Sequence, residues 1–184
     1  LGVSAFGGSV MFPADQALNL EEAADKVLTL STEGAVLVAR ARPGGTCDTL
    51  AQRNGTLQRA TGSVFKTWLL GGVARGVAAG TIAPTENLTM TGAIQAPGGV
   101  INQEPAGTTF PVGDLATLMQ GISDNTATDM LLARVGRSPV ETLVVDWGMP
   151  AAPSANPLLP FMGITQTFHL FRSFPLTTAE AWPT

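Results

Sequence analysis

The stretch from Ser63 to Ala79 constrains the fold of this chain most. Apolar side chains recur there in steps of four residues, and Lys66 is the only charged residue before Arg75. Residues four apart share one face of a helix. The stripe consists of Phe65, Leu69, Val73 and Val77. This pattern predicts a central helix that is buried along the stripe, with Gly80 as its stop.

The remaining elements follow from apolar spacing and from turn residues. Before the central helix, residues 16–30 have the spacing of an amphipathic helix, and residues 34–40 and 49–55 read as two paired strands. After it, the pattern predicts helices over residues 114–122, 126–136, 138–148 and 165–174, with a Pro-rich loop at 151–163. The predicted fold class is α+β, with an antiparallel sheet packed against helices and a mainly helical region.

Two short strands make a poor sheet by themselves. We therefore expect further strands after residue 184, and we interpret residues 1–184 as the N-terminal portion of a single domain. Within it, the helix and strands occupy about residues 16–55, and the helical region occupies about residues 63–174.

Composition excludes several classes of function. The chain is 45% hydrophobic and 13% charged, with a net charge of −4 and no basic cluster, which argues against nucleic-acid binding. No apolar run is long enough for a membrane span. With one cysteine and one histidine, we expect no internal disulfide, metal site or cofactor. Cys47 reads as a small buried or strand-end residue, and His169 as a packing or surface residue of a helix.

Ser63 and Lys66 lie three residues apart at the start of the central helix. This spacing places both side chains on one helix face, so the amine can reach back to the hydroxyl. A serine becomes a strong nucleophile when a base takes its proton, and burial makes a lysine amine such a base by lowering its pKa. The pair predicts a nucleophile and its base. The alternative is a lysine that extends from a core helix to solvent, beside an unrelated serine.

Ser123, Asp124 and Asn125 form a second candidate group, between two predicted helices. Residues of these types are preferred helix N-caps, and we expect Asp124 to cap the helix that follows. A capping role does not explain why the triplet follows an S-x-x-K motif within one chain.

Taken together, TGSVFK and SDNTATDMLL resemble the serine β-lactamase and penicillin-binding-protein superfamily, nearest the class A type. The predicted helix, strand pair and helical region follow in the family's order. The resemblance implies that Ser63 forms an acyl-enzyme after Lys66 accepts its proton, and that the Ser63 N–H is half of an oxyanion hole. It also implies that Ser123 passes a proton to the leaving nitrogen, Asn125 holds Lys66 or the substrate amide, and Asp124 fixes the turn.

The sequence departs from this pattern at two points. The only lysines are Lys26 and Lys66, so the family's K-T-G motif is absent from these residues. It lies beyond Thr184 or has been lost, and we favour the first. The loop at 151–163 holds no Asp or Glu that could activate water as the class A glutamate does. Asn156 reads as an ordinary loop residue or as a remnant polar contact.

The leading interpretation is a serine hydrolase or acyltransferase that acts on β-lactams or related amide, peptide or ester substrates. The alternatives are a D-alanyl peptidase, a penicillin-sensing module without turnover, an esterase and an inactive homologue. A C-terminal portion of the same protein is the one protein partner that the sequence suggests. The resemblance implies export from the cytoplasm, although residues 1–12 do not read as a signal peptide.

Overall fold

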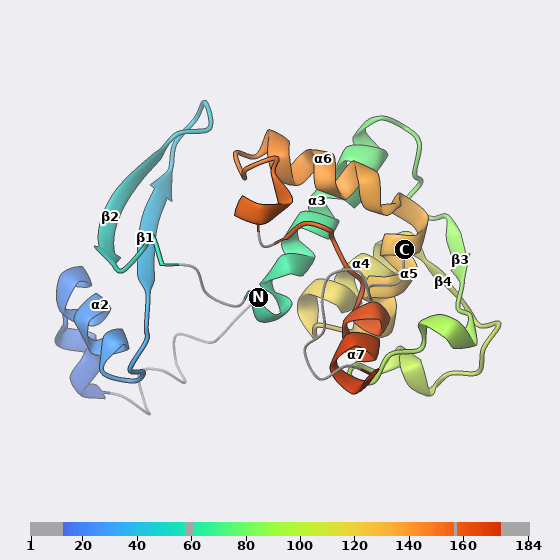
Figure 1. Cartoon of the computed structure of the whole chain (residues 1–184), viewed down its shortest axis with the longest axis horizontal. Helices are drawn as coiled ribbons and strands as arrows, with labels where there is room; N and C mark the ends of the chain where they lie inside the picture. The colour runs from blue at the N-terminus through green and yellow to red at the C-terminus, as the bar shows by residue number, and fades with distance from the viewer. Residues whose placement is uncertain (1–12, 58–60, 157, 174–184) are drawn as a thin grey trace. The chain divides into compact units, whose positions relative to one another are not determined.

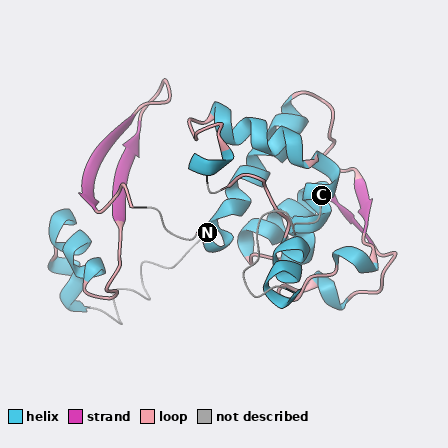
Figure 2. Cartoon of the chain, in the orientation of Figure 1, coloured by secondary structure: helices cyan, strands magenta, loops and turns pink. Residues whose placement is uncertain are grey.

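The computed structural model describes residues 13–57, 61–156 and 158–173. The chain divides into two compact units, residues 1–60 and residues 61–184, and each is described by itself. The first contains α2 and both predicted strands, and the second is mainly helical (Figures 1 and 2). The predicted combination of helices and antiparallel strands is confirmed.

In the first unit, helix α2 (Leu20–Leu28) packs against a hairpin of β1 (Val36–Ala41) and β2 (Cys47–Arg53). The helix begins with a capping box, in which Asn19 Oδ1 accepts from the Glu22 N–H and the Glu22 carboxylate accepts from the Asn19 N–H. The predicted helix was too long, because this cap sets its start at Leu20. Cys47 is the first residue of β2, which agrees with the prediction of a strand-end residue. Its side chain is exposed rather than buried.

The second unit is built around α3 (Lys66–Ala78), α4 (Val112–Gly121) and α5 (Asn125–Val135). A 3-10 turn over Gly62–Phe65 leads into α3, and Gly80 ends it with a positive φ of 71°. The predicted stripe holds in the core, since Leu69 and Val73 are buried and Phe65 and Val77 pack against the same cluster.

Two strands and two further helices also belong to this unit. A short antiparallel pair is formed by β3 (Asn87–Thr89) and β4 (Thr109–Pro111). Helices α6 (Arg137–Asp146) and α7 (Ile164–Ser173) follow α5 and flank the Pro-rich loop. Arg134 on α5 pairs with Glu86 at 2.5 Å and ties α5 to the segment before β3.

Within the described residues, none of the helices has the length and apolar character that a membrane crossing requires.

Candidate active site

Ser63 lies in the 3-10 turn that precedes α3, and its side chain is exposed. The first N–H groups of a helix have no intrahelical acceptor, so this turn presents backbone donors beside the hydroxyl. No hydrogen bond joins the Ser63 hydroxyl to any described residue.

Lys66 is buried, with 1% of its surface exposed, and its amine makes three hydrogen bonds. Nζ lies 2.7 Å from the Ser123 carbonyl oxygen, 2.9 Å from Ser123 Oγ and 2.8 Å from Asn125 Oδ1. The expected bond back to the Ser63 hydroxyl is not among them, because the three ammonium hydrogens are directed to the α4–α5 turn. The structure thus brings Lys66, Ser123 and Asn125 into direct contact, with Ser63 one helical turn before the lysine.

Burial lowers the pKa of the Lys66 ammonium below the ordinary lysine value. The carboxylates of Asp124 and Asp129 oppose this shift, because negative charge favours the protonated form. The neutral amine is consequently more populated near neutral pH than it would be at an exposed lysine. This is the protonation state that a base needs.

The turn that holds the amine is strained at one residue and tightly bonded at the next. Ser123 has a φ of 60°, which is uncommon for a residue with a side chain. Asp124 is fully buried and accepts from the Ala127 N–H at 2.9 Å, so the predicted helix cap is confirmed. Its other oxygen accepts from the N–H groups of Val100 and Ile101 at 2.6 Å and 3.1 Å.

The same turn fixes the segment of residues 96–98. Asn125 donates from Nδ2 to the Pro97 carbonyl at 2.6 Å, and its backbone N–H donates to the Gly98 carbonyl at 2.9 Å. Thr126 both accepts from and donates to the Ala96 backbone. The Asn125 side chain therefore bridges the lysine amine on one side and the Pro97 carbonyl on the other.

The Pro-rich loop meets the start of α3 through an aromatic contact. Phe161 is buried, and its ring meets the Phe65 ring edge to face with centroids 5.7 Å apart. Asn156, which read as an ordinary loop residue or a remnant polar contact, is buried; it donates to Pro150 O, just before the loop, and accepts from Leu158 N–H. The loop thus places an aromatic ring, and no carboxylate of its own, beside the candidate nucleophile's helix.

Sequence reasoning missed Asp129. Its carboxylate is buried on α5 and accepts from the backbone N–H of Ile164, and from both the N–H and hydroxyl of Thr165. These bonds cap α7 from another helix. An i, i+4 spacing from Asn125 was the one available signal, because it places both residues on one face of α5.

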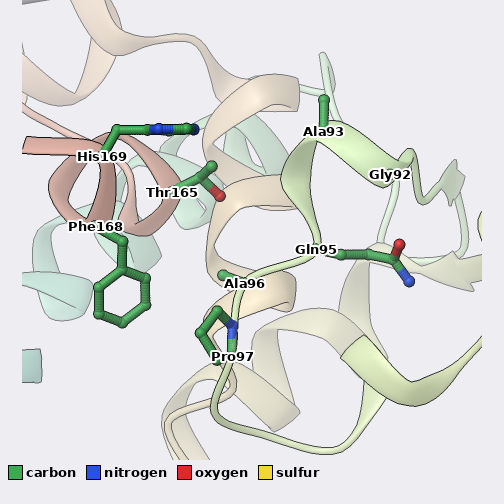
Figure 3. A pocket seen from close by; sticks show the side chains of 8 residues that line it. All are labelled: Gly92, Ala93, Gln95, Ala96, Pro97, Thr165, Phe168 and His169. Carbon is green, nitrogen blue, oxygen red and sulfur yellow. The ribbon is translucent and has the colours of Figure 1, made fainter. Parts of the chain in front are cut away.

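His169 is exposed on α7, in agreement with a surface role. It lines a cavity of about 270 Å³ between α7 and the segment of residues 92–97. Figure 3 shows Thr165 and His169 extending from α7 toward this segment, while the Gln95 side chain points away from α7. The cavity is separate from Ser63 and Lys66, neither of which lines it.

Solved structures resemble this chain over part of their length. A beta-lactamase from Sphaerobacter thermophilus is 33% identical, with a TM-score of 0.57 over 68% of this chain and 47% of that one. A structure of PBP-A is 25% identical, with a TM-score of 0.56 over 75% of this chain and 53% of that one. An ancestral class A beta-lactamase (GNCA), at 19% identity and a TM-score of 0.59, shares the fold over 71% of this chain and 50% of its own.

The chain spans about half the length of these structures. No curated protein matches it. Residues 16–181 match the family described as the beta-lactamase enzyme family, and the chain belongs to that family.

Proposed function

We propose that this protein is a serine acyl-transfer enzyme in which Ser63 forms a covalent acyl-enzyme with a β-lactam or a related amide or ester. The observation that carries the proposal is the buried Lys66 amine, held by Ser123 and Asn125 one helical turn from an exposed serine. A lysine with no role in chemistry is rarely buried, because desolvating its charge is costly.

The family resemblance implies the role of each residue, and the contacts of Lys66 with Ser123 and Asn125 support this assignment. The neutral Lys66 amine takes the Ser63 hydroxyl proton as Oγ attacks the substrate carbonyl, and the Ser63 N–H stabilises the oxyanion that forms. The Ser123 hydroxyl contacts the amine at 2.9 Å, so it can give its own proton to the leaving nitrogen and recover one from Lys66. The carbonyl–nitrogen bond breaks, the acyl group stays on Ser63, and Asn125 and Asp124 hold the amine and the turn.

The choice of substrate rests on the relatives. The Sphaerobacter protein is described as a beta-lactamase, and it is 33% identical to this chain. A β-lactam is therefore the substrate class that we propose first. Family resemblance also supports action outside the cytoplasm, which cell fractionation would test.

A long-lived acyl-enzyme is the second candidate function, as in a penicillin-binding or penicillin-sensing protein. The Pro-rich loop favours it, because residues 151–163 contain no carboxylate to activate water. The Asn156 side chain is bonded to Pro150 O and Leu158 N–H, and the Phe161 ring contacts the Phe65 ring edge to face. Deacylation through this loop would lack a general base.

One labelling experiment tests both candidates. The protein at its full natural length is incubated with a fluorescent penicillin beside Ser63→Ala, and hydrolysis of a chromogenic cephalosporin is followed in parallel. Lasting label on the wild type and none on Ser63→Ala supports a stable acyl-enzyme, whereas turnover without lasting label supports a beta-lactamase. Equal label on Ser63→Ala, or neither label nor turnover, would refute the proposal for β-lactams, and hydrolysis of a simple ester would then favour an esterase.

A further inference from the structure

Gln120 contacts the lysine from a side that neither motif of the sequence indicates. It lies on the last turn of α4 and is half-buried, and its Nε2 donates to the backbone carbonyl of Lys66 at 3.1 Å. That carbonyl belongs to the first residue of α3. A side chain at the end of one helix thus holds the first peptide group of the helix that carries the candidate base.

Lys66 is consequently held at both of its ends by one short segment. Three residues after Gln120, Ser123 accepts from the amine through its carbonyl and its hydroxyl, and Asn125 supplies the third acceptor. The segment is itself closed by Leu118, whose carbonyl accepts from the N–H groups of Ile122 and Asp124, both at 3.2 Å. The backbone carbonyl and the side-chain amine of Lys66 are therefore both hydrogen-bonded to residues 120–125.

We propose that Gln120 is a positioning residue for acylation, whose bond to the Lys66 carbonyl keeps the lysine amine seated on Ser123 and Asn125. The inference rests on the proposed function of Ser63 and Lys66. Without this bond, the first peptide group of α3 loses its link to the end of α4, and small displacements of a catalytic group slow a reaction strongly.

The mechanism predicts how the lysine titrates when the bond is removed. The charged groups that act on the amine are Asp124 on the turn and Asp129 on α5, and burial is the largest influence. If the amine loosens, water reaches it, and the pKa of Lys66 rises toward the ordinary lysine value. Less neutral amine is then present at neutral pH, and acylation slows.

Gln120→Met tests the bond, because methionine keeps the length of the side chain and removes the donor. Thr117→Val is the matched control, since it removes another bond from an α4 side chain to a backbone carbonyl, 2.9 Å to Gly113, that does not involve Lys66. Single-turnover acylation by a fluorescent penicillin is measured against pH in the full-length protein, well below the unfolding temperature of each variant. Lysine labelled with ¹³C reports the Lys66 titration independently, with its signal assigned by its loss in Lys66→Met.

We expect Gln120→Met to acylate about five-fold more slowly, the rate equivalent of one ordinary hydrogen bond, with penicillin affinity little changed. The Lys66 titration and the acid limb of the rate profile should both move to higher pH. Thr117→Val should have the acylation rate of the wild type and the same acid limb in its pH–rate profile. If Gln120→Met keeps the acylation rate, the acid limb and the Lys66 titration of the wild type, the inference about Gln120 is wrong and the proposed function still stands. If Ser63→Ala is labelled as strongly as the wild type, both the inference and the proposed function are wrong.

Discussion

The amine of Lys66 lies 2.7 Å from the backbone carbonyl of Ser123, a residue whose φ of 60° places it in the left-handed region. The two facts are linked, because this backbone conformation directs the carbonyl and the hydroxyl of one residue at the same amine. Local strain of this kind persists where surrounding contacts hold it, and it is frequent at functional sites.

Replacing Ser123 by glycine and by alanine separates the backbone strain at this residue from the role of its hydroxyl in acylation. Both variants lose the hydroxyl, but only alanine keeps a side chain at positive φ. We expect Ser123→Gly to be more stable than Ser123→Ala by about 1 kcal/mol in chemical denaturation. Both should acylate more slowly, by roughly 100-fold if the hydroxyl shuttles a proton. Equal stability of the two variants would show that the turn is unstrained.

Gly99 is predicted to tolerate no side chain. It has a φ of 116°, and a Cβ there would collide with the Asp124 carboxylate. Gly107 is the control, because its φ is 99° and a Cβ there would meet nothing within 4 Å. Gly107→Ala should cost about 1–2 kcal/mol of unfolding free energy from strain alone, and Gly99→Ala about 2 kcal/mol more from the collision. Penicillin labelling should fall in Gly99→Ala only, and equal costs would contradict this reading of the contact.

Asp129→Asn should lower both the free energy of unfolding and the pKa of Lys66. The carboxylate accepts three hydrogen bonds at the start of α7, and asparagine offers one oxygen, so we expect a loss of about 1–3 kcal/mol. The carboxylate also raises the pKa of Lys66, so its removal should lower that pKa further. The acid limb of the acylation rate should then move to lower pH.

Asp146→Asn provides the control for that change of charge. Asp146 is exposed on α6 and pairs with Arg75 at 2.7 Å, so its removal should cost less than about 1 kcal/mol. The acid limb of this variant should stay where it is in the wild type. A limb that moves equally in both variants would mean that net charge, rather than Asp129, sets the titration.

The lowered pKa of Lys66 should also make the free energy of unfolding depend on pH. Burial lowers the pKa of this lysine in the folded state, so the unfolded chain binds more protons between the folded and unfolded pKa values. The stability of the wild type relative to Lys66→Met should therefore rise with pH across that interval and be flat below it. Urea unfolding of both proteins over a pH series measures the difference. A difference that falls with rising pH would contradict a depressed pKa.

Periodic patterns in the sequence predicted most of the helices. The stripe that includes Leu69 and Val73 is buried as expected, and α5 and α6 begin within a residue of their predicted starts. Apolar periodicity works here because each helix buries one face against the same core. Helix ends were less accurate where a local cap, such as the one at Asn19, decided the boundary.

The contacts between distant segments could not be predicted in this way. Asp129 reads as an ordinary helical carboxylate, because its partners Ile164 and Thr165 lie 35 and 36 residues further along the chain. The direction of the Lys66 amine depends on how α3 meets the α4–α5 turn. Spacing along α3 indicated Ser63 as its partner, and tertiary packing gave it Ser123 and Asn125.

The carboxylate of Asp124 joins two stretches of chain through the amides of Val100, Ile101 and Ala127. The Ala127 amide is capped within its own turn, whereas the Val100 and Ile101 amides are released for deuterium exchange when the two stretches separate. The exchange rates of Val100 and Ile101 therefore form a single reporter of whether the turn beneath the lysine is closed. The reporter needs no substrate, so the integrity of the site can be followed in the free protein.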